Sequence, residues 1–261
     1  MAFADRGRSV VEYAAMDRPD PSAYGQKAAH VYDRLVADLG VDDPATVPTL
    51  AEYSNGGRVL ELGVGTGRVA IPLAGRGIDV WGIDVSDAMV AKLKEKPGGD
   101  RVTCVLGDFG DVGVDGEFAL VYVVFNTFFA LTSQQEQIEC FANVAAHLPP
   151  GGFFLIEAFV PDVTRFDGAQ RVQVQSLGAD RARLGLSIHD SVNQRIHGQQ
   201  IEMSEAGIEM IPIEMRYAWP SELDLMARLT GLTLRDRWAG WRREPFTVSS
   251  TAHVSLYEKP R

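Results

Sequence analysis

The stretch Arg58-Val-Leu-Glu-Leu-Gly-Val-Gly-Thr-Gly-Arg68 decides the fold. Its apolar first half suits a buried strand, and residues 69–73 follow it with a run that suits a helix. Between the two lie Gly63, Gly65 and Gly67, each separated by one residue. Glycine lets the backbone pass close to a ligand, and a helix start offers free N–H groups to acceptor atoms. This order of strand, glycine turn and helix predicts the entry to a nucleotide-type site in an open α/β sheet.

The spacing of the glycines differs from the dinucleotide fingerprint G-x-G-x-x-G. Counted from Gly63, the third glycine is replaced by Arg68. Counted from Gly65, it is replaced by Ala70, which the fingerprint allows. Glu61 lies two residues before the first glycine, where its charge would repel a pyrophosphate and attract a cationic ligand. An NAD-dependent oxidoreductase therefore stays open as a weaker alternative.

The segment Glu61-Leu-Gly-Val-Gly-Thr-Gly67 resembles the first motif of class I S-adenosylmethionine-dependent methyltransferases. The resemblance implies an α/β fold with a Rossmann-like seven-stranded mixed sheet flanked by helices. It also implies that the glycine turn runs under the methionine and ribose parts of the cofactor, and that Glu61 lies near the cofactor's amino end.

The next predicted strand, residues 78–84, ends in an acid. Asp84 follows Gly63 by about 20 residues, the spacing at which an acid meets ribose hydroxyls in α/β nucleotide sites. Its carboxylate can accept hydrogen bonds from both hydroxyls. The resemblance implies that Met89, at the start of the following helix, lies beside the adenine. It also implies that Val85 contacts the cofactor.

The third and fourth predicted strands, residues 102–106 and 118–124, each lead into further candidate contacts. The resemblance implies that Asp108 accepts from the adenine amino group and that the Phe109 N–H donates to a ring nitrogen. In the family, residues after the fourth strand lie beside the transferred methyl group, and the matching residues here are Val124 and Phe125. The residues expected to bind S-adenosylmethionine are Tyr32, Glu61, Gly63, Gly65, Gly67, Asp84, Val85, Met89, Asp108, Phe109, Val124 and Phe125.

A helix with apolar residues at helical spacing is predicted shortly before the glycine turn. It can simply pack over the sheet. In many small-molecule methyltransferases a Tyr-Asp pair at this place, here Tyr32-Asp33, closes the site. Amino-sugar N-methyltransferases also have an upstream tyrosine that faces the substrate, and Tyr24 matches it. The amino-sugar N-methyltransferases can have a histidine at the position of Ala130. Its absence puts in doubt whether this chain has their general base.

Residues 171–217 tend to alternate polar and apolar side chains, which predicts antiparallel strands with one solvated face. In the family such an insertion forms a cap that binds the acceptor, the molecule that receives the methyl group. His189 attracts attention there, although a hairpin with outward polar side chains is the favoured explanation. We expect four parts: a lid and arm at 1–57, a cofactor-binding core at 58–160, the cap at 161–217, and a terminal helix and hairpin at 218–261 that complete the core sheet.

The expected reaction is in-line attack on a sulfonium, driven mainly by holding two reactants together. A neutral amine needs little help, whereas a hydroxyl acceptor needs a base, for which Tyr24, His189 and Glu157 are candidates. We expect methylation of a small molecule, with the nitrogen of a nucleotide-linked amino sugar from natural-product biosynthesis slightly favoured over a hydroxyl. A protein that binds the cofactor without catalysis is the remaining alternative.

The bulk properties of the 261-residue chain narrow the choice of partners. Its net charge of −10 disfavours nucleic acid, which requires a basic surface. No long apolar stretch or signal-peptide pattern is present, so we expect a cytoplasmic protein without a membrane contact. Cys104 and Cys140 alone make no metal cluster, and no metal is expected. A homodimer is possible, but the sequence does not determine the oligomeric state.

Overall fold

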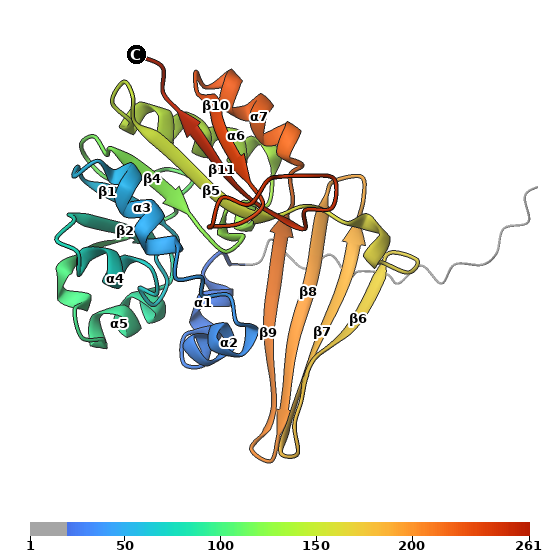
Figure 1. Ribbon diagram of the computed structural model, residues 1–261. Coiled ribbons are helices and arrows are strands. Elements are labelled where there is room, and N and C mark those ends of the chain that lie inside the picture. The colour runs from blue at the N-terminus through green and yellow to red at the C-terminus, as the bar shows by residue number, and fades with distance from the viewer. Residues whose placement is uncertain (1–19) are drawn as a thin grey trace, which may run out of the picture.

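The computed structural model describes residues 20–261, and the greater part of the expected N-terminal arm lies outside this range. A seven-stranded sheet flanked by helices and a second, four-stranded sheet make up the molecule (Figure 1). The strand order of the larger sheet is β10-β11-β5-β4-β1-β2-β3. The mixed sheet and the separate antiparallel layer confirm the expected fold class.

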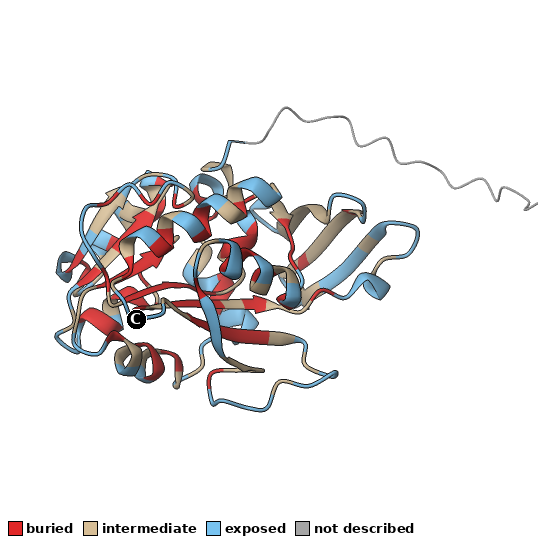
Figure 2. Ribbon diagram, turned by 90° about the horizontal axis from the view of Figure 1, so that it is seen from above, coloured by how far each residue is buried: buried red, intermediate tan, exposed pale blue. Residues whose placement is uncertain are grey.

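Five parallel strands form most of the larger sheet, and an antiparallel pair completes it. The parallel strands are β1 (Val59–Leu62), β2 (Val80–Asp84), β3 (Val102–Leu106), β4 (Leu120–Val123) and β5 (Phe153–Phe159). The antiparallel strands are β10 (Thr233–Trp238) and β11 (Ala252–Glu258), of which β11 pairs with β5. Strands β1 and β4 are buried along their whole length, as expected for a parallel sheet covered on both faces (Figure 2).

Helices flank the larger sheet (Figure 1). They are α3 (Thr46–Ser54), α4 (Ala70–Ala74), α5 (Asp87–Glu95), α6 (Gln134–His147) and α7 (Pro220–Leu229), with short 3₁₀ helices η1 (Gly99–Arg101), η2 (Thr127–Ala130) and η3 (Val163–Arg165). Ser133 and Glu136 form a capping box at the start of α6. Helix α7 begins at Pro220, a residue favoured in the first helical turn, with Trp219 as its N-cap residue.

The smaller sheet is a meander of long hairpins that extends away from the larger one (Figure 1). Its strands are β6 (Gln170–Leu177), β7 (Arg181–Asp190), β8 (Arg195–Ser204) and β9 (Gly207–Arg216). Buried Arg216 at the end of β9 attaches this sheet to the core, because its guanidinium donates to Gln137 of α6 at 2.6 Å and to Glu222 of α7 at 2.7 Å.

Two short helices, α1 (Ala23–Ala28) and α2 (Tyr32–Leu39), lie between the two sheets (Figure 1). On one side, Gly25 of α1 packs so closely on α5 that an added Cβ would lie 2.5 Å from the Cβ of Ser86. On the other side, His30 pairs with Glu209 at 3.0 Å and Arg34 pairs with Glu202 at 2.7 Å. The single helix expected here is thus two helices that bridge the core and the second sheet.

Among the helices of residues 20–261, none combines the length and apolar character that a membrane span requires. The same residues contain no cluster of three or more His, Cys, Asp or Glu side chains arranged to hold a metal ion. The four-part division of the chain and the possible homodimer stay predictions.

Candidate functional site

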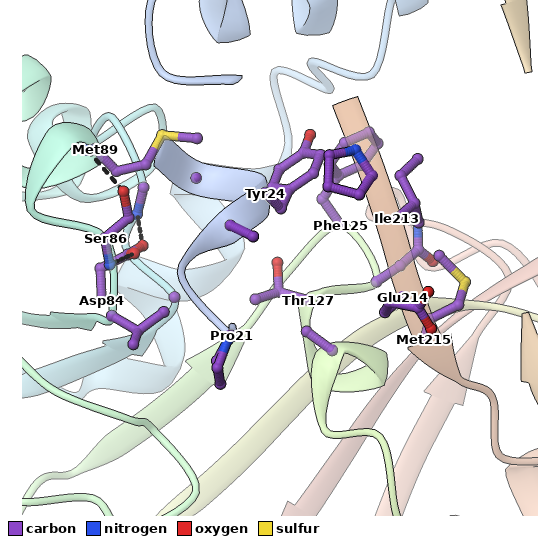
Figure 3. Close-up of a pocket in the computed structure, with 18 of the residues that line it drawn as sticks. Pro21, Tyr24, Asp84, Ser86, Met89, Phe125, Thr127, Ile213, Glu214 and Met215 are labelled. Atoms are coloured by element: carbon purple, nitrogen blue, oxygen red, sulfur yellow. Dashed lines mark hydrogen bonds between the residues drawn. The ribbon is translucent and has the colours of Figure 1, made fainter. Parts of the chain in front are cut away.

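A cavity of about 360 Å³ opens where the carboxyl ends of the parallel strands meet α1 and strand β9. We refer to it as the central cavity. Figure 3 shows Asp84, Ser86 and Met89 on one side of it and Ile213, Glu214 and Met215 of β9 on the other, with Tyr24 between them. Ligands of open α/β sheets bind at this edge of the sheet.

The glycine turn after β1 forms part of the cavity wall. All three glycines have positive φ, at 71° for Gly63, 53° for Gly65 and 79° for Gly67. A Cβ on Gly63 would lie 2.4 Å from Thr127, and one on Gly67 would lie 2.7 Å from Leu93. Gly65 lines the cavity, and a Cβ there would meet no protein atom within 4 Å. The first and third glycines are therefore needed for packing, and Gly65 leaves space at the cavity wall.

Asp84 joins the glycine turn to the next loop. Its carboxylate accepts from the N–H of Gly65 at 2.7 Å and from the N–H of Ser86 at 2.9 Å. Burial raises the pKa of this carboxyl above its usual value, which the backbone hydrogen bonds oppose. A carboxylate has about four lone-pair sites. Asp84 lines the cavity with lone pairs left for the hydroxyls of a ligand.

Glu61 lies in the core and does not line the cavity. Its carboxylate accepts from the buried Tyr122 hydroxyl at 2.9 Å, and Glu61 is 2% exposed. Burial raises the pKa of Glu61 to about 8, although the Tyr122 hydroxyl and the charge of Arg68 oppose this shift. The expected contact between Glu61 and the cofactor's amino end stays a prediction.

The other predicted cofactor residues divide between cavity and core. Those that line the central cavity, besides Gly63, Gly65 and Asp84, are Tyr32, Val85, Met89, Asp108, Phe109 and Phe125. Val124 is buried in the core and Gly67 packs on α5, so neither lines it. The direction of the side chain decides whether a residue lines the cavity or packs in the core. The sequence pattern does not specify this direction at the end of a strand.

The turn after β4 contains two consecutive non-glycine residues in the left-handed region, Phe125 with φ 54° and Asn126 with φ 66°. Glu157 of β5 holds this turn, because its carboxylate accepts from the Phe125 N–H at 2.8 Å and its backbone carbonyl accepts from the Asn126 N–H at 3.1 Å. The second carboxylate oxygen accepts from the Trp241 indole at 2.7 Å. Backbone strain of this kind concentrates at functional sites.

This geometry gives Glu157 a positioning role. Both of its oxygens are engaged and it lines no part of the central cavity. Burial raises its pKa. A role as general base stays a prediction that these contacts do not favour.

Tyr24 and Tyr32 face each other edge to face, with ring centroids 6.5 Å apart, and both line the central cavity. Burial raises the pKa of Tyr32 to about 12 and raises that of Tyr24 further. Both hydroxyls are therefore neutral at ordinary pH. Asp33 attaches this segment to the glycine turn, since it accepts from the Thr66 hydroxyl at 2.6 Å and pairs with Lys96 at 2.7 Å.

His189 lies apart from the glycine turn. It lines a second cavity, of about 370 Å³, which we call the sheet cavity because the four-stranded sheet contributes most of its wall. Its Nε2 lies 2.9 Å from the Tyr217 hydroxyl, and its ring stacks on Phe166 at 4.4 Å. Burial lowers the pKa of His189, so its imidazole is mostly neutral at pH 7.

Three residues of the site escaped the sequence analysis. Gly25 allows α1 to close on Ser86, and Asn126 accepts from the Phe159 N–H at 2.7 Å. Glu214 of β9 lines the central cavity, on the side opposite Asp84 and Ser86 (Figure 3). The alternating pattern of residues 210–215 indicated a strand, but it carried no information about which face would meet the cavity.

Comparison with known proteins agrees with this geometry. A family model described as a methyltransferase domain matches residues 59–152. Cypemycin N-terminal methyltransferase of a Streptomyces species is 30% identical over 243 residues, which cover 92% of this chain and 99% of the relative. The chain belongs to the S-adenosylmethionine-dependent methyltransferases.

Two solved structures resemble this methyltransferase. The CcbJ methyltransferase of Streptomyces caelestis is 37% identical, with a TM-score of 0.86 over 93% of this chain and 100% of that one. The S-adenosylmethionine-bound amino pentose methyltransferase CalS10 of Micromonospora echinaspora has a TM-score of 0.65 at 20% identity over 88% of this chain and 96% of that one, a likeness of fold alone. S-adenosylmethionine is thus the cofactor, and the NAD-dependent and non-catalytic alternatives are set aside.

The residues of the central cavity fit this cofactor. Gly65 leaves open space against the wall, and Asp84 offers acceptors for ribose hydroxyls. Met89, Asp108 and Phe109 supply an apolar surface and an acceptor for a base. When bound there, S-adenosylmethionine supplies an electrophilic methyl group.

Burial of Glu61 predicts a pH-dependent stability. The unfolded carboxyl ionises near 4.5 and the folded one near 8, so the folded state holds more protons in between and the unfolding free energy falls as pH rises through this range. The slope reaches up to about 1.4 kcal/mol per pH unit. Glu61→Gln should remove it, as measured by urea unfolding between about pH 5 and about pH 8. Exposed Glu117→Gln is the control, and equal slopes in wild type and Glu61→Gln would contradict the assignment.

The open space at Gly65 predicts that a methyl group there interferes with the cofactor. Gly65→Ala should weaken S-adenosylhomocysteine binding by more than roughly tenfold, because the new Cβ occupies the cavity. Gly77→Ala is a matched control, since Gly77 also has positive φ, 82°, with nothing within 4 Å of the added Cβ, but lines no part of the central cavity. Both variants should lose similar stability. Equal calorimetric affinities in the two variants would place the cofactor elsewhere.

Proposed function

We propose that this methyltransferase methylates an amine nitrogen of a small natural-product acceptor that binds in the central cavity. The observation that carries the proposal is Glu214 of β9, a carboxylate residue that lines this cavity on the side opposite Asp84 and Ser86 (Figure 3). A relative that is named for N-terminal methylation and matches nearly the whole chain supports an amine acceptor.

Glu214 is oriented by its neighbour in the sheet. His197 on β8 lies directly opposite Glu214 on β9, and His197 Nδ1 bonds to the Glu214 carboxylate. Both side chains are 13% exposed. A carboxylate held in this way attracts an ammonium group, and it can accept the proton that an amine must lose before it attacks.

The proposed reaction needs little further catalysis. The amine lone pair forms the new C–N bond while the C–S bond breaks, so the nitrogen must lie in line with the methyl group and the sulfur. Holding the two reactants in that geometry supplies about 7–11 kcal/mol of the barrier. Tyr24 lies between the glycine turn and β9, where its neutral ring and hydroxyl separate this space from solvent (Figure 3).

The finer prediction, an amino sugar linked to a nucleotide, stays part of this proposal. The two adjoining cavities provide room for an acceptor larger than a single sugar ring. A hydroxyl acceptor is the alternative outcome, and His189 beside Tyr217 is then the candidate base.

The deciding experiment follows the transfer of a labelled methyl group from S-adenosylmethionine to a panel of amines and their matched hydroxyl analogues. The panel contains amino sugars, nucleotide-linked amino sugars, and peptides with a free α-amine. We expect transfer to amines, with mass spectrometry locating the added methyl on nitrogen. Transfer to hydroxyls alone would refute the proposal.

Substitution of Glu214 predicts a specific loss on amine acceptors. Glu214→Gln should lower kcat/KM by roughly tenfold to a hundredfold, because the amide neither attracts an ammonium nor accepts its proton. Affinity for S-adenosylhomocysteine should stay unchanged. Glu205→Gln, in the exposed hairpin next to β9, serves as control. Unchanged kinetics of Glu214→Gln would remove Glu214 from the mechanism.

A further inference from the structure

The sheet cavity adjoins the central cavity. Both are lined by Leu39, Asn126, Gln200, Ile213 and Met215. A molecule whose amine lies beside Glu214 therefore has a route along these residues into the sheet cavity, if it is long enough.

Two arginines line the sheet cavity, Arg165 from η3 and Arg171 from β6. Across residues 20–261 neither guanidinium forms an ion pair or a side-chain hydrogen bond. The remaining carboxylate of the wall, Asp162, accepts from the backbone N–H and the hydroxyl of Thr164 at 3.0 and 2.6 Å. Burial and the charge of Arg165 lower the pKa of Arg171, and the charge of Asp162 opposes this shift. All three charged groups line the same cavity. The protein as a whole is acidic, with a net charge of −10. In this wall two guanidinium groups accompany a single carboxylate, Asp162, so the site carries a local positive charge that favours an anion.

The same wall carries polar atoms that lack a partner within the described chain. The side-chain oxygens of Gln175 and Gln200, two residues of this wall, are buried without a hydrogen bond. Buried acceptors of this kind usually meet a donor. Hydroxyl or amide groups of a ligand would supply such donors. The stacked rings of Phe166 and His189 complete the wall with a flat surface.

We propose that the acceptor carries an anionic group, a carboxylate or a phosphate, that binds Arg165 and Arg171 in the sheet cavity while its amine lies beside Glu214 in the central cavity. The hydroxyl or amide groups between the two ends donate to the glutamines. This inference rests on the proposed function, since the acceptor must be one whose amine reaches the central cavity. To the proposed function, the inference adds an anionic group that anchors the acceptor and the orientation of the acceptor across the two cavities. Bidentate binding of carboxylate and phosphate is the common use of paired arginines.

The binding arm of the test uses simple anions. Calorimetry measures the affinity of inorganic pyrophosphate and of succinate for the protein saturated with S-adenosylhomocysteine. The double variant Arg165→Gln/Arg171→Gln should bind at least one of them roughly tenfold more weakly than wild type. Arg181→Gln is the matched control, because Arg181 belongs to the same sheet but lines neither cavity. If the double variant loses affinity for pyrophosphate, the anchoring group of the acceptor is a phosphate. If it loses affinity for succinate, the anchoring group is a carboxylate. Equal binding by all three proteins, or no binding of either anion to wild type, overturns the site.

The kinetic arm compares glucosamine with glucosamine 6-phosphate, 2-amino-2-deoxyglucuronate and uridine diphosphate glucosamine. Wild type and Arg181→Gln should prefer an anionic acceptor in kcat/KM by roughly tenfold, and the double variant should lose this preference. A preference for neutral glucosamine contradicts the inference. Methylation of a hydroxyl with the anion preference intact would refute only the proposed amine chemistry. If none of the acceptors is methylated, the binding arm alone decides.

Discussion

The carboxylate of Asp84 holds the turn on which the site depends. Asp84, at the end of β2, accepts from the Gly65 N–H and the Ser86 N–H, so one side chain fixes the loops after both β1 and β2. Glu61, in β1, lies in the core and is compensated by the Tyr122 hydroxyl. Both carboxyls have raised pKa values because burial disfavours their charged forms. We expect that the positive charge of a cofactor bound in the central cavity offsets part of the cost of burying these acidic groups.

The site is complete only where three separate segments meet. The core supplies the glycine turn and the strained turn at Phe125 and Asn126, which Glu157 holds through two hydrogen bonds. Helices α1 and α2 close one side, because Gly25 permits contact with Ser86 and ion pairs attach the helices to the second sheet. Strand β9 closes the opposite side with Glu214 (Figure 3). Such enclosure excludes water from the reacting atoms and restricts the acceptors that can enter.

The two cavities divide the proposed work. The central cavity holds the cofactor and the reacting amine, where neutral tyrosines and one paired carboxylate suffice for a transfer driven by proximity. The sheet cavity provides the contacts that distinguish one acceptor from another, through its arginines and unpartnered amides. Placing selectivity on an appended sheet leaves the cofactor site of the core unchanged, so acceptor preference can vary without loss of the methyl-transfer geometry.

The sequence by itself determined the elements and the cofactor side of the site. Apolar runs and the glycine spacing are local signals, and they located the parallel strands, the turn at Gly63–Gly67 and the acid at Asp84. Tertiary structure decided the rest, because side-chain direction at strand ends and the pairing of distant segments leave no local pattern. It buried Val124 in the core, engaged both oxygens of Glu157 and placed His189 in a separate cavity. It also brought Glu214 to the central cavity and both Arg165 and Arg171 to the sheet cavity, since only the packing of distant segments sets those neighbours.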